Sequence, residues 1–404
     1  MRGIDREMAT LLEIAQQRLY PNYRPAPFVL ARGKGSELFD TDGRRYLDMA
    51  AGVAVCSLGH AHPKYVAAIA EQVARLGHVS NYFYNEPNVR LADELCRRTG
   101  MDRAFFCNSG AEAIEALLKL ARRHFHAKGD ERRVRVIAFD NSFHGRTMGA
   151  LALTGQAKYQ SGFGPGVGGV THVPYGDLGA VEGAMGDDVA AIIAEPIQGE
   201  GGVLPAPEGF LAGLRALADR HGALLLFDEV QTGVGRTGTF LGCEHDRVGA
   251  DAIALAKGLG GGFPIGAMLC REALSGALAP GTHGSTYGGN ALASAAALSV
   301  LSVLDEEGLM AGAITKGAHL SKLLRGVAER LPAVAESERG RGLLRALVMN
   351  GKPDMRAVAA KVREHGVLVT IAGERGLRFT PPLVVTTAEL DEAVTRVEKA
   401  LREL

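Results

Sequence analysis

The segment Ala223–Gly238, ALLLFDEVQTGVGRTG, places a charged residue at the end of a short apolar run. Four consecutive apolar residues, 224 to 227, precede Asp228. A run without polar alternation predicts a strand buried on both faces, which is typical of a parallel sheet covered by helices. Such sheets bind ligands beyond the carboxyl ends of their strands. Asp228 is therefore a candidate binding residue, and an ionised aspartate buried there needs a cationic partner.

A second segment, Asp251–Met268, DAIALAKGLGGGFPIGAM, places a lysine in a comparable position. Lys257 follows a short apolar run and precedes several glycines, which leave space beside it. Burial favours the neutral amine, and a neutral lysine can bond an aldehyde as a Schiff base. The alternative is a surface lysine with a solvated amino group. Together, Lys257 and Asp228 suit pyridoxal phosphate, whose aldehyde takes a lysine and whose ring nitrogen takes a carboxylate.

Predicted strands and helices alternate through the middle of the chain. We expect strands near 134–139, 170–173 and 189–194, a helix over 210–221, and then the Asp228 strand. This alternation predicts an α/β protein with a mostly parallel sheet. Helices are expected within 291–330, and a helix that opens with a capping box, Thr386 to Glu389, closes the chain. Residues 33–48 predict two short strands joined at Asp42–Gly43, and residues 1–19 predict an amphipathic helix.

A phosphate site is predicted in residues 104–121, AFFCNSGAEAIEALLKLA, where an apolar strand turns into a helix. The backbone N–H groups of Ser109, Gly110 and Ala111 lie at the positive end of that helix, so they can hold a phosphate without a lysine. Ser109 also suits an N-cap, with Glu112 completing a capping box. The two interpretations are compatible, because capping and phosphate binding use the same free donors.

Six ordered motifs and one additional segment resemble class III pyridoxal-phosphate-dependent aminotransferases. The motifs are AFDNSFHGRT, AEPIQGEGG, LLLFDEVQTGVGRTG, AKGLGGGFPIGA, HGSTYGGN and RFTPPL, and SNYFYNEP resembles the acetylornithine branch in particular. The resemblance covers nearly the whole chain from about residue 20. It implies a fold-type-I α/β enzyme with a large pyridoxal-phosphate-binding domain over 61–300. A smaller α+β domain over 301–404 would pack with the N-terminal segment 1–60.

The resemblance also implies roles for individual residues around the cofactor. Lys257 would carry the Schiff base and shuttle a proton, Asp228 would bind the ring nitrogen, and Gln231 the ring hydroxyl. Val230 and Phe143 would sandwich the ring. The remaining cofactor contacts would be made by Ser109, Gly110 and Ala111 at the phosphate and by Thr286, which would reach the phosphate from a neighbouring subunit. A homodimer with shared sites follows, although HGSTYGGN could also be an ordinary glycine loop.

Substrate contacts are implied for Arg146, Glu200, Arg378 and Ser285. Arg378 should pair the carboxylate on the reacting carbon of 2-oxoglutarate, and Glu200 should pair Arg378 when the amine substrate is bound. A fixed ion pair between Glu200 and Arg378 is the alternative. Arg146 should bind the carboxylate distant from the reacting carbon, unless it is only a helix-surface arginine. Val53 is expected to form an apolar wall that disfavours free ornithine.

The reaction implied is transfer of the terminal amino group of N2-acetyl-L-ornithine to 2-oxoglutarate, in arginine biosynthesis. Succinylornithine, a carrier-linked lysine and 4-aminobutyrate are alternative amines. A nicotinamide-dependent oxidoreductase is the rival class, because 233–238 matches G-x-G-x-x-G. Its first glycine follows the strand too late for a tight strand-to-helix turn, and no helix is predicted after it. A catalytically dead binding protein would be expected to lack Lys257 or Asp228, and both are present.

Composition limits the remaining function classes. The chain has 404 residues, 47% apolar residues and a formal net charge of +0, so no basic footprint indicates nucleic acid. The five cysteines form no C-x-x-C pair, which suggests reduced thiols and a cytoplasmic location. His60 and His62 in GHAHP are weak metal candidates, since the loop before Pro63 is sufficient to explain them, and we expect no metal. We expect His124 and His126 to be solvated on a charged helical face.

Overall fold

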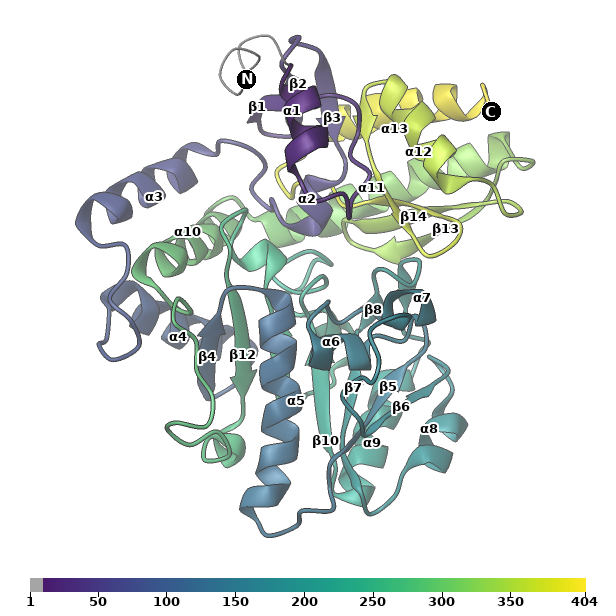
Figure 1. The fold of residues 1–404 in the computed structure, drawn as a ribbon. Coiled ribbons are helices and arrows are strands. Elements are labelled where there is room, and N and C mark those ends of the chain that lie inside the picture. Colours follow the sequence, from purple (N-terminus) through teal and green to yellow (C-terminus); the bar gives the residue numbers. More distant parts are fainter. Residues whose placement is uncertain (1–9) are drawn as a thin grey trace, which may run out of the picture.

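The computed structural model describes residues 10–404, and a seven-stranded sheet forms its centre (Figure 1). Strand β12 runs antiparallel to both of its neighbours, and the other paired strands are parallel. The predicted α/β class with a mostly parallel sheet is therefore confirmed. In spatial order the strands are β4 (Arg103–Cys107), β12 (Gly266–Cys270), β11 (Ala252–Leu255), β10 (Leu224–Asp228), β7 (Val189–Ala194), β5 (Arg135–Phe139) and β6 (Val170–Val173).

Helices cover both faces of this sheet, which explains why its central strands lack polar alternation. Leu224 and Leu226 of β10 belong to the apolar cluster under α5 (Gly110–Ala127). Leu225 and Phe227 belong to the cluster that contains α9 (Phe210–His221) on the other face. Successive side chains of a strand point to opposite faces, so an all-apolar run fills both layers. The shorter helices of this part of the chain are α6 (Met148–Leu153), α7 (Ala157–Gln160) and α8 (Leu178–Ala184).

The two ends of the chain meet in a second sheet. Its strands are β1 (Leu30–Lys34), β2 (Glu37–Asp40), β3 (Arg45–Asp48) and β15 (Val367–Leu368), and β15 pairs with β3 in parallel. The sequence predicted two strands within 33–48, joined at Asp42–Gly43, whereas the structure has β2 and β3 there and the end of β1. A turn at Gly35 separates β1 from β2, with φ +56 at this glycine. The domain boundaries near 60 and 300 remain a prediction.

A third sheet lies in the C-terminal part, close to the N-terminal strands (Figure 1). Its strands are β13 (Ala335–Arg341), β14 (Leu344–Met349), β17 (Gly376–Phe379) and β16 (Thr370–Ala372), and a two-stranded ribbon is formed by β8 (Ile197–Gln198) and β9 (Leu204–Pro205). The helices of this part are α11 (Leu309–Arg330), α12 (Met355–Glu364) and α13 (Thr387–Leu401). Thr386 and Glu389 form the predicted capping box at the start of α13.

The remaining helices are α1 (Leu11–Arg18), α2 (Ala51–Ala54), α3 (Pro63–Arg75), α4 (Glu86–Thr99) and α10 (Ala291–Glu306). The predicted N-terminal helix is present as α1, and the part of that prediction on residues 1–9 lies outside the described residues. His124 of α5 is buried against the ring of Phe125, so its predicted solvation is wrong, whereas His126 is exposed. No helix within residues 10–404 has the length and apolarity needed to cross a bilayer.

Candidate active site

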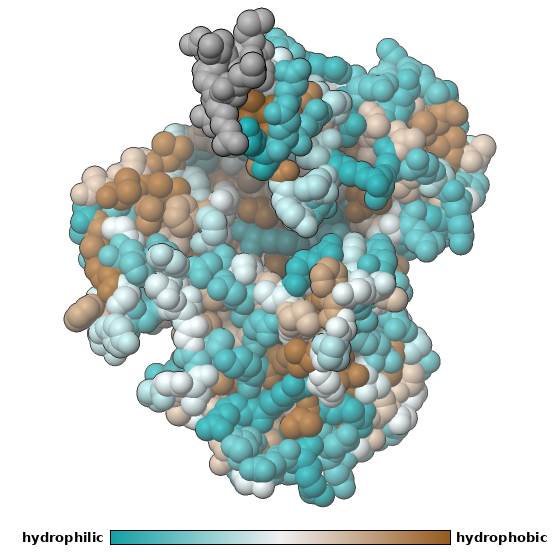
Figure 2. Space-filling view, viewed as in Figure 1, coloured by the Kyte–Doolittle hydropathy of each residue, from teal (hydrophilic) through white to brown (hydrophobic). Residues whose placement is uncertain are grey.

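A cavity of about 440 Å³ lies at the carboxyl ends of the central strands. Its mouth opens where the molecular surface is hollowed between the part that carries α5 and the part that carries α13 (Figure 2). The volume suits a small-molecule site. Most of the predicted site residues line this cavity, namely Ser109, Gly110, Ala111, Phe143, Arg146, Glu200, Asp228, Val230, Gln231 and Lys257.

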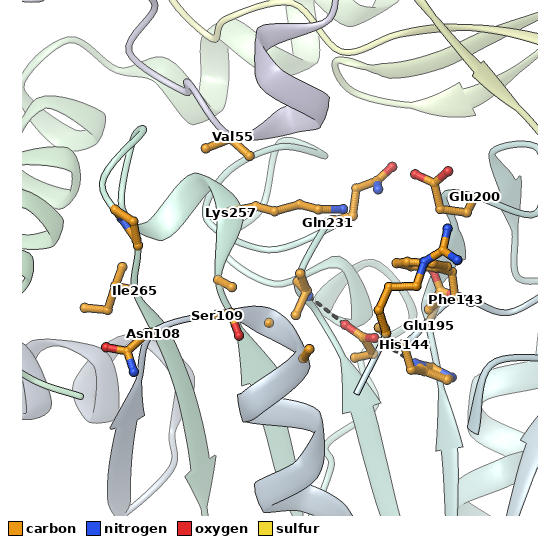
Figure 3. A pocket seen from close by; sticks show the side chains of 18 of the residues that line it. Val55, Asn108, Ser109, Phe143, His144, Glu195, Glu200, Gln231, Lys257 and Ile265 are labelled. Atoms are coloured by element: carbon orange, nitrogen blue, oxygen red, sulfur yellow. Dashed lines mark hydrogen bonds and ion pairs between the residues drawn. The ribbon is translucent and has the colours of Figure 1, made fainter. Parts of the chain in front are cut away.

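Lys257 begins a short 3-10 turn just beyond β11, and its side chain extends across the cavity toward Gln231 (Figure 3). Its backbone has φ +39, a conformation that costs energy in a residue with a side chain and that is found preferentially at functional sites. Burial lowers the pKa of the Lys257 amino group, and the nearby Glu200 and Asp228 oppose this shift. The structure therefore favours a neutral, nucleophilic amine inside the cavity.

Asp228 ends β10 with both carboxylate oxygens occupied. Oδ2 lies 2.7 Å from Nδ1 of His144, and Oδ1 accepts a hydrogen bond of 3.0 Å from the Val230 N–H. His144 is fully buried; desolvation alone would lower the pKa of its imidazole, but Asp228 outweighs it and raises the pKa. The other ring nitrogen, Nε2, has no partner within residues 10–404. Sequence reasoning missed His144, although it follows Phe143 in the quoted motif.

Glu195 is a second cavity residue that the sequence analysis missed. It follows β7, and its carboxylate accepts hydrogen bonds from the N–H groups of Phe143 (3.0 Å) and Gly199 (3.2 Å). Burial raises the pKa of Glu195 to about 7; His144 opposes this shift and the negative charge of Asp228 adds to it. The position directly after an all-apolar strand, the same signal that identified Asp228, could have found it.

The amino end of α5 faces the cavity with free backbone donors. Ser109 Oγ accepts from the Glu112 N–H (3.2 Å), as predicted for an N-cap. The Glu112 carboxylate accepts from the N–H of Asn108 (2.7 Å) instead of the N–H of Ser109, so the predicted capping box is incomplete. The N–H groups of Gly110 and Ala111 meet no acceptor within residues 10–404. They remain available to an anion.

Gly110 packs closely against the side chain of Val230 in the cavity wall. A Cβ atom at this position would lie 2.9 Å from Cγ1 of Val230, a distance that real side chains do not adopt. Glycine therefore allows Val230 to lie directly beside the free N–H groups of α5. An apolar surface and an anion site are thus adjacent in the same cavity.

Arg378 lies in β17 of the C-terminal part; it is not itself a cavity residue, but it contacts two residues that line the cavity, Glu200 and Gln231. Its Nη1 donates to Glu200 Oε1 (2.5 Å), Gln231 Oε1 (3.1 Å) and the Gly199 carbonyl (3.2 Å). Arg378 is buried, with 2% exposure, and Nε donates to Thr370 Oγ1. Desolvation raises the pKa of Glu200, but Arg378 and Lys257 outweigh it, so its pKa is lowered. The predicted ion pair between Glu200 and Arg378 is therefore present. Gln231, which was expected to bind the cofactor ring hydroxyl, contacts Arg378 in this structure.

Arg146 lies at the rim of the cavity and is exposed. Its guanidinium carbon is 5.5 Å from the ring centroid of Phe143, which also lines the cavity. No carboxylate of residues 10–404 pairs with Arg146, in contrast to Arg378. The Arg146 guanidinium is therefore open to a carboxylate that enters from solvent.

Ser285 and Thr286 lie outside this cavity. Ser285 Oγ is 3.3 Å from Nδ2 of Asn108, which lines the cavity, and it accepts from the Gly288 N–H (3.0 Å). Thr286 is exposed and is not among the residues that line the cavity. Val53 is also not on the cavity wall. The structure places Val55 there instead, because residues 51–54 have left-handed backbone angles that turn the chain.

The weaker sequence signals have ordinary structural explanations. His60 contacts Asp48 (2.8 Å) and His62 contacts Glu307 (3.2 Å), so each imidazole has one acidic partner that the local sequence did not reveal. Residues 233–238, the G-x-G-x-x-G match, form successive turns, and the next helical element within residues 10–404 is the 3-10 helix Gly242–Asp246. The helix amino end that a dinucleotide fingerprint requires is absent from this segment.

The chain is similar over nearly its full length to several named aminotransferases. It is 53% identical to an acetylornithine aminotransferase of Myxococcus xanthus, with 96% of both chains covered. It is 46% identical to a succinylornithine transaminase/acetylornithine aminotransferase of Pseudomonas aeruginosa, covering 96% of this chain and 95% of that one. A crystal structure of ornithine aminotransferase from Toxoplasma gondii, with partial occupancy of PLP, matches with a TM-score of 0.93 and 37% identity over 98% of this chain and 95% of that chain.

The family model that describes aminotransferase class-III matches residues 19–401. The match spans the central sheet, the C-terminal sheet and every residue of the cavity. The chain belongs to the class-III aminotransferases.

Proposed function

We propose that this aminotransferase binds pyridoxal phosphate and moves the terminal amino group of N2-acetyl-L-ornithine to 2-oxoglutarate, giving N-acetylglutamate 5-semialdehyde and glutamate. The observation that carries the proposal is a single cavity that holds the Lys257 amine, the Asp228 carboxylate and the free N–H groups of α5. These groups match the aldehyde, the ring nitrogen and the phosphate of the cofactor.

The cavity residues fit this cofactor chemically. Gly110 and Ala111 offer two N–H groups to the phosphate, and Val230 offers an apolar face beside them. Asp228 offers a carboxylate whose charge is supported by the imidazole of His144. Phe143 and Val230 would enclose the ring, and Gln231 would reach its hydroxyl after leaving Arg378. When bound, the cofactor supplies an electron sink for the carbon that exchanges its amino group.

Each residue has a defined task in this proposal. Lys257 Nζ holds the proton that moves between carbon atoms, and burial lowers the pKa of the amine, which favours the neutral form that a base requires. Asp228 preserves the positive charge of the ring nitrogen, and His144 orients Asp228. Glu195 accepts hydrogen bonds from the N–H groups of Phe143 and Gly199, so it ties the backbone at Phe143 to the segment before Glu200.

The ion pair between Glu200 and Arg378 supports a site that serves two different substrates. The amine substrate has no carboxylate on its reacting carbon, so Arg378 can keep Glu200 as its partner. 2-Oxoglutarate has such a carboxylate, which would replace Glu200 at Arg378. Leaving a buried arginine without any partner costs about 3 to 5 kcal/mol, so an exchange of partners is favoured over a vacancy. Arg146 would hold the distant carboxylate that both substrates share.

The names of the relatives and the lining of the cavity support an acylated ornithine as the amine. Val55 and Ile265 are apolar cavity residues, and the charged α-amino group of free ornithine would lose solvation beside them. Acylation removes that charge. The relative named for both succinylornithine and acetylornithine keeps the succinyl compound as an alternative amine. The sequence motif SNYFYNEP favours the acetylornithine branch over 4-aminobutyrate and carrier-linked lysine.

A side-by-side assay tests the substrate. N2-acetyl-L-ornithine, N2-succinyl-L-ornithine, L-ornithine and 4-aminobutyrate are each supplied with 2-oxoglutarate, and glutamate is measured. We expect kcat/KM for acetylornithine to exceed that for ornithine by about two orders of magnitude, one decade for each 1.36 kcal/mol of lost solvation. Comparable or better activity on ornithine or 4-aminobutyrate would show that the proposed amine is wrong.

A chemical label tests the lysine. The purified protein should be yellow, and borohydride reduction followed by peptide mapping should find the cofactor attached to Lys257. Lys257→Ala should show no turnover. A label on another lysine, or on none, would reject this part of the proposal.

We infer further that the protein acts as a homodimer in the cytoplasm. Thr286 is exposed and lies outside its own cavity, which suits contact with the phosphate of a neighbouring subunit. Tyr82, Phe83 and Tyr84 are 92%, 69% and 96% exposed, more than a free surface favours for adjacent aromatic residues. Light scattering should give twice the chain mass, and Thr286→Ala should weaken cofactor binding.

The cysteines support the cytoplasmic location. All five cysteines are free thiols, which supports a reducing compartment.

A further inference from the structure

Tyr159 lies beside Arg146 at the rim of the cavity, although it is not itself a cavity residue. The guanidinium carbon of Arg146 is 4.0 Å from the centroid of the Tyr159 ring, closer than the 5.5 Å to Phe143. Both distances lie within the range in which an aromatic ring attracts a cation. The rings of Tyr159 and Phe143 meet edge to face, with centroids 5.8 Å apart and an interplanar angle of 82°. Arg146 therefore rests against two rings that also support each other.

The position of Tyr159 is fixed by α7, a helix of a single turn that side-chain hydrogen bonds hold in place. Gln156 Nε2 donates to the carbonyls of Asn141 and Ser142, each at 3.2 Å, immediately before Phe143 in the chain. Gln160 Nε2 donates to the carbonyls of Leu151 (3.3 Å) and Thr154 (2.9 Å). These bonds tie both ends of α7 to the loop and the helix that surround Arg146. The backbone that carries Tyr159 is thus anchored to the chain on both sides of Arg146.

We propose that Tyr159 is a positioning residue that holds the Arg146 guanidinium toward the cavity and so sets the preference for substrates with a carboxylate distant from the reacting carbon. This inference rests on the proposed function. An exposed arginine without a carboxylate partner has many rotamers, and binding a substrate would have to fix one of them. The Tyr159 ring makes that selection beforehand without neutralising the charge. A carboxylate partner would also fix the side chain, but the substrate would then have to displace it.

The ring rather than the hydroxyl carries the interaction. The Tyr159 hydroxyl makes no hydrogen bond within residues 10–404, and the contact is measured to the ring centroid. Tyr159→Phe should therefore preserve the function, and Tyr159→Leu should remove it. Lys158 provides a matched control, because its Nζ lies 4.8 Å from the centroid of the same ring and its side chain is solvent-exposed. Lys158→Met removes a positive charge there and leaves the contact between Tyr159 and Arg146.

The test is a double-mutant cycle on the cofactor-loaded enzyme. We expect Tyr159→Leu to raise KM for acetylornithine about fivefold, with kcat within about twofold of wild type. Tyr159→Phe and Lys158→Met should have KM and kcat values near those of wild type. In an Arg146→Ala background, Tyr159→Leu should change KM less than about twofold. Calorimetric titration with glutarate, which binds without reacting, should show the same pattern in Kd.

Several results would overturn the proposal. The first is that Tyr159→Leu raises KM equally with and without Arg146, and the second is that Tyr159→Leu does not raise KM at all. A third is that Lys158→Met raises KM as much as Tyr159→Leu does, which would assign the effect to local charge. Loss of the cofactor absorbance in Tyr159→Leu would assign the ring to the fold instead. If the wild type fails to turn over acetylornithine but the glutarate cycle still shows the coupling, the proposed substrate is wrong and the role of Tyr159 stands.

Discussion

Two arginines at or beside the same cavity lie in opposite environments. Arg378 is buried in β17 and bonds to Glu200, Gln231 and the Gly199 carbonyl. Arg146 lies at the rim, exposed, against two aromatic rings and without a carboxylate among residues 10–404. A buried cation must find its partners within the protein, whereas an exposed cation has water. In the proposed function, Arg378 would therefore bind a carboxylate only by exchange of a protein partner, whereas Arg146 would bind one without such an exchange.

The largest effect is expected from Arg378→Ala. The half-reaction with 2-oxoglutarate should slow by about two to three orders of magnitude, because the carboxylate on the reacting carbon would lose its partner in a buried site. The half-reaction with the amine should change less than about tenfold. Stopped-flow absorbance of the cofactor measures each half-reaction separately. Equal slowing of both would show that Glu200 and Arg378 form a fixed structural pair and would remove the difference between the two ends.

Arg146→Ala should act on both half-reactions alike. The amine substrate and 2-oxoglutarate share the distant carboxylate, and a hydrogen bond to a charged group contributes about 1.5 to 3 kcal/mol, so kcat/KM should fall by about tenfold to a hundredfold for each. Arg146→Lys is the matched control; it keeps the charge but lacks the planar fork, and it should recover part of the loss. Steady-state kinetics with each substrate varied in turn provides the measurement. A loss confined to one substrate would contradict an open, shared end.

The sequence predicted the parts of this site that follow a strand. Asp228 and Lys257 end or follow buried strands, and their neighbours along the chain determine where they lie. The helix α9 and the strands β7 and β10 lie where they were predicted, because α9 has a helical apolar pattern and the two strands are short uninterrupted apolar runs. Local sequence was sufficient wherever the position of a residue depends on its own element.

Local sequence was insufficient where two distant segments meet. His144 contacts Asp228 from a loop 84 residues earlier in the chain, and no spacing rule connects them. Val53 was predicted on the cavity wall, but the left-handed turn of residues 51–54 presents Val55 instead. His124 was predicted in solvent because charged residues flank it, whereas the packing of α5 buries it. These positions depend on tertiary contacts or on backbone angles that the residue types do not reveal.

The smallest effect is expected in the acid sensitivity of the fold, measured without added cofactor. The folded pKa of Glu200 lies below the ordinary 4.5, because Arg378 and Lys257 outweigh burial. A lowered carboxyl pKa stabilises the fold above the unfolded value, and this contribution is lost as the pH falls through the folded value. The free energy of unfolding of the wild type, measured with urea, should therefore fall as the pH is lowered from neutral through 4.5 and below. The free energy of unfolding of Glu200→Gln should fall less steeply in this range.

Arg146→Gln is the control at the rim. Since Arg146 pairs with no carboxylate of residues 10–404, its variant should follow the wild-type slope. Two outcomes would contradict the difference between the arginines. One is that the free energy of unfolding of Glu200→Gln falls with pH as steeply as that of the wild type. The other is that the free energy of unfolding of Arg146→Gln falls less steeply than that of the wild type.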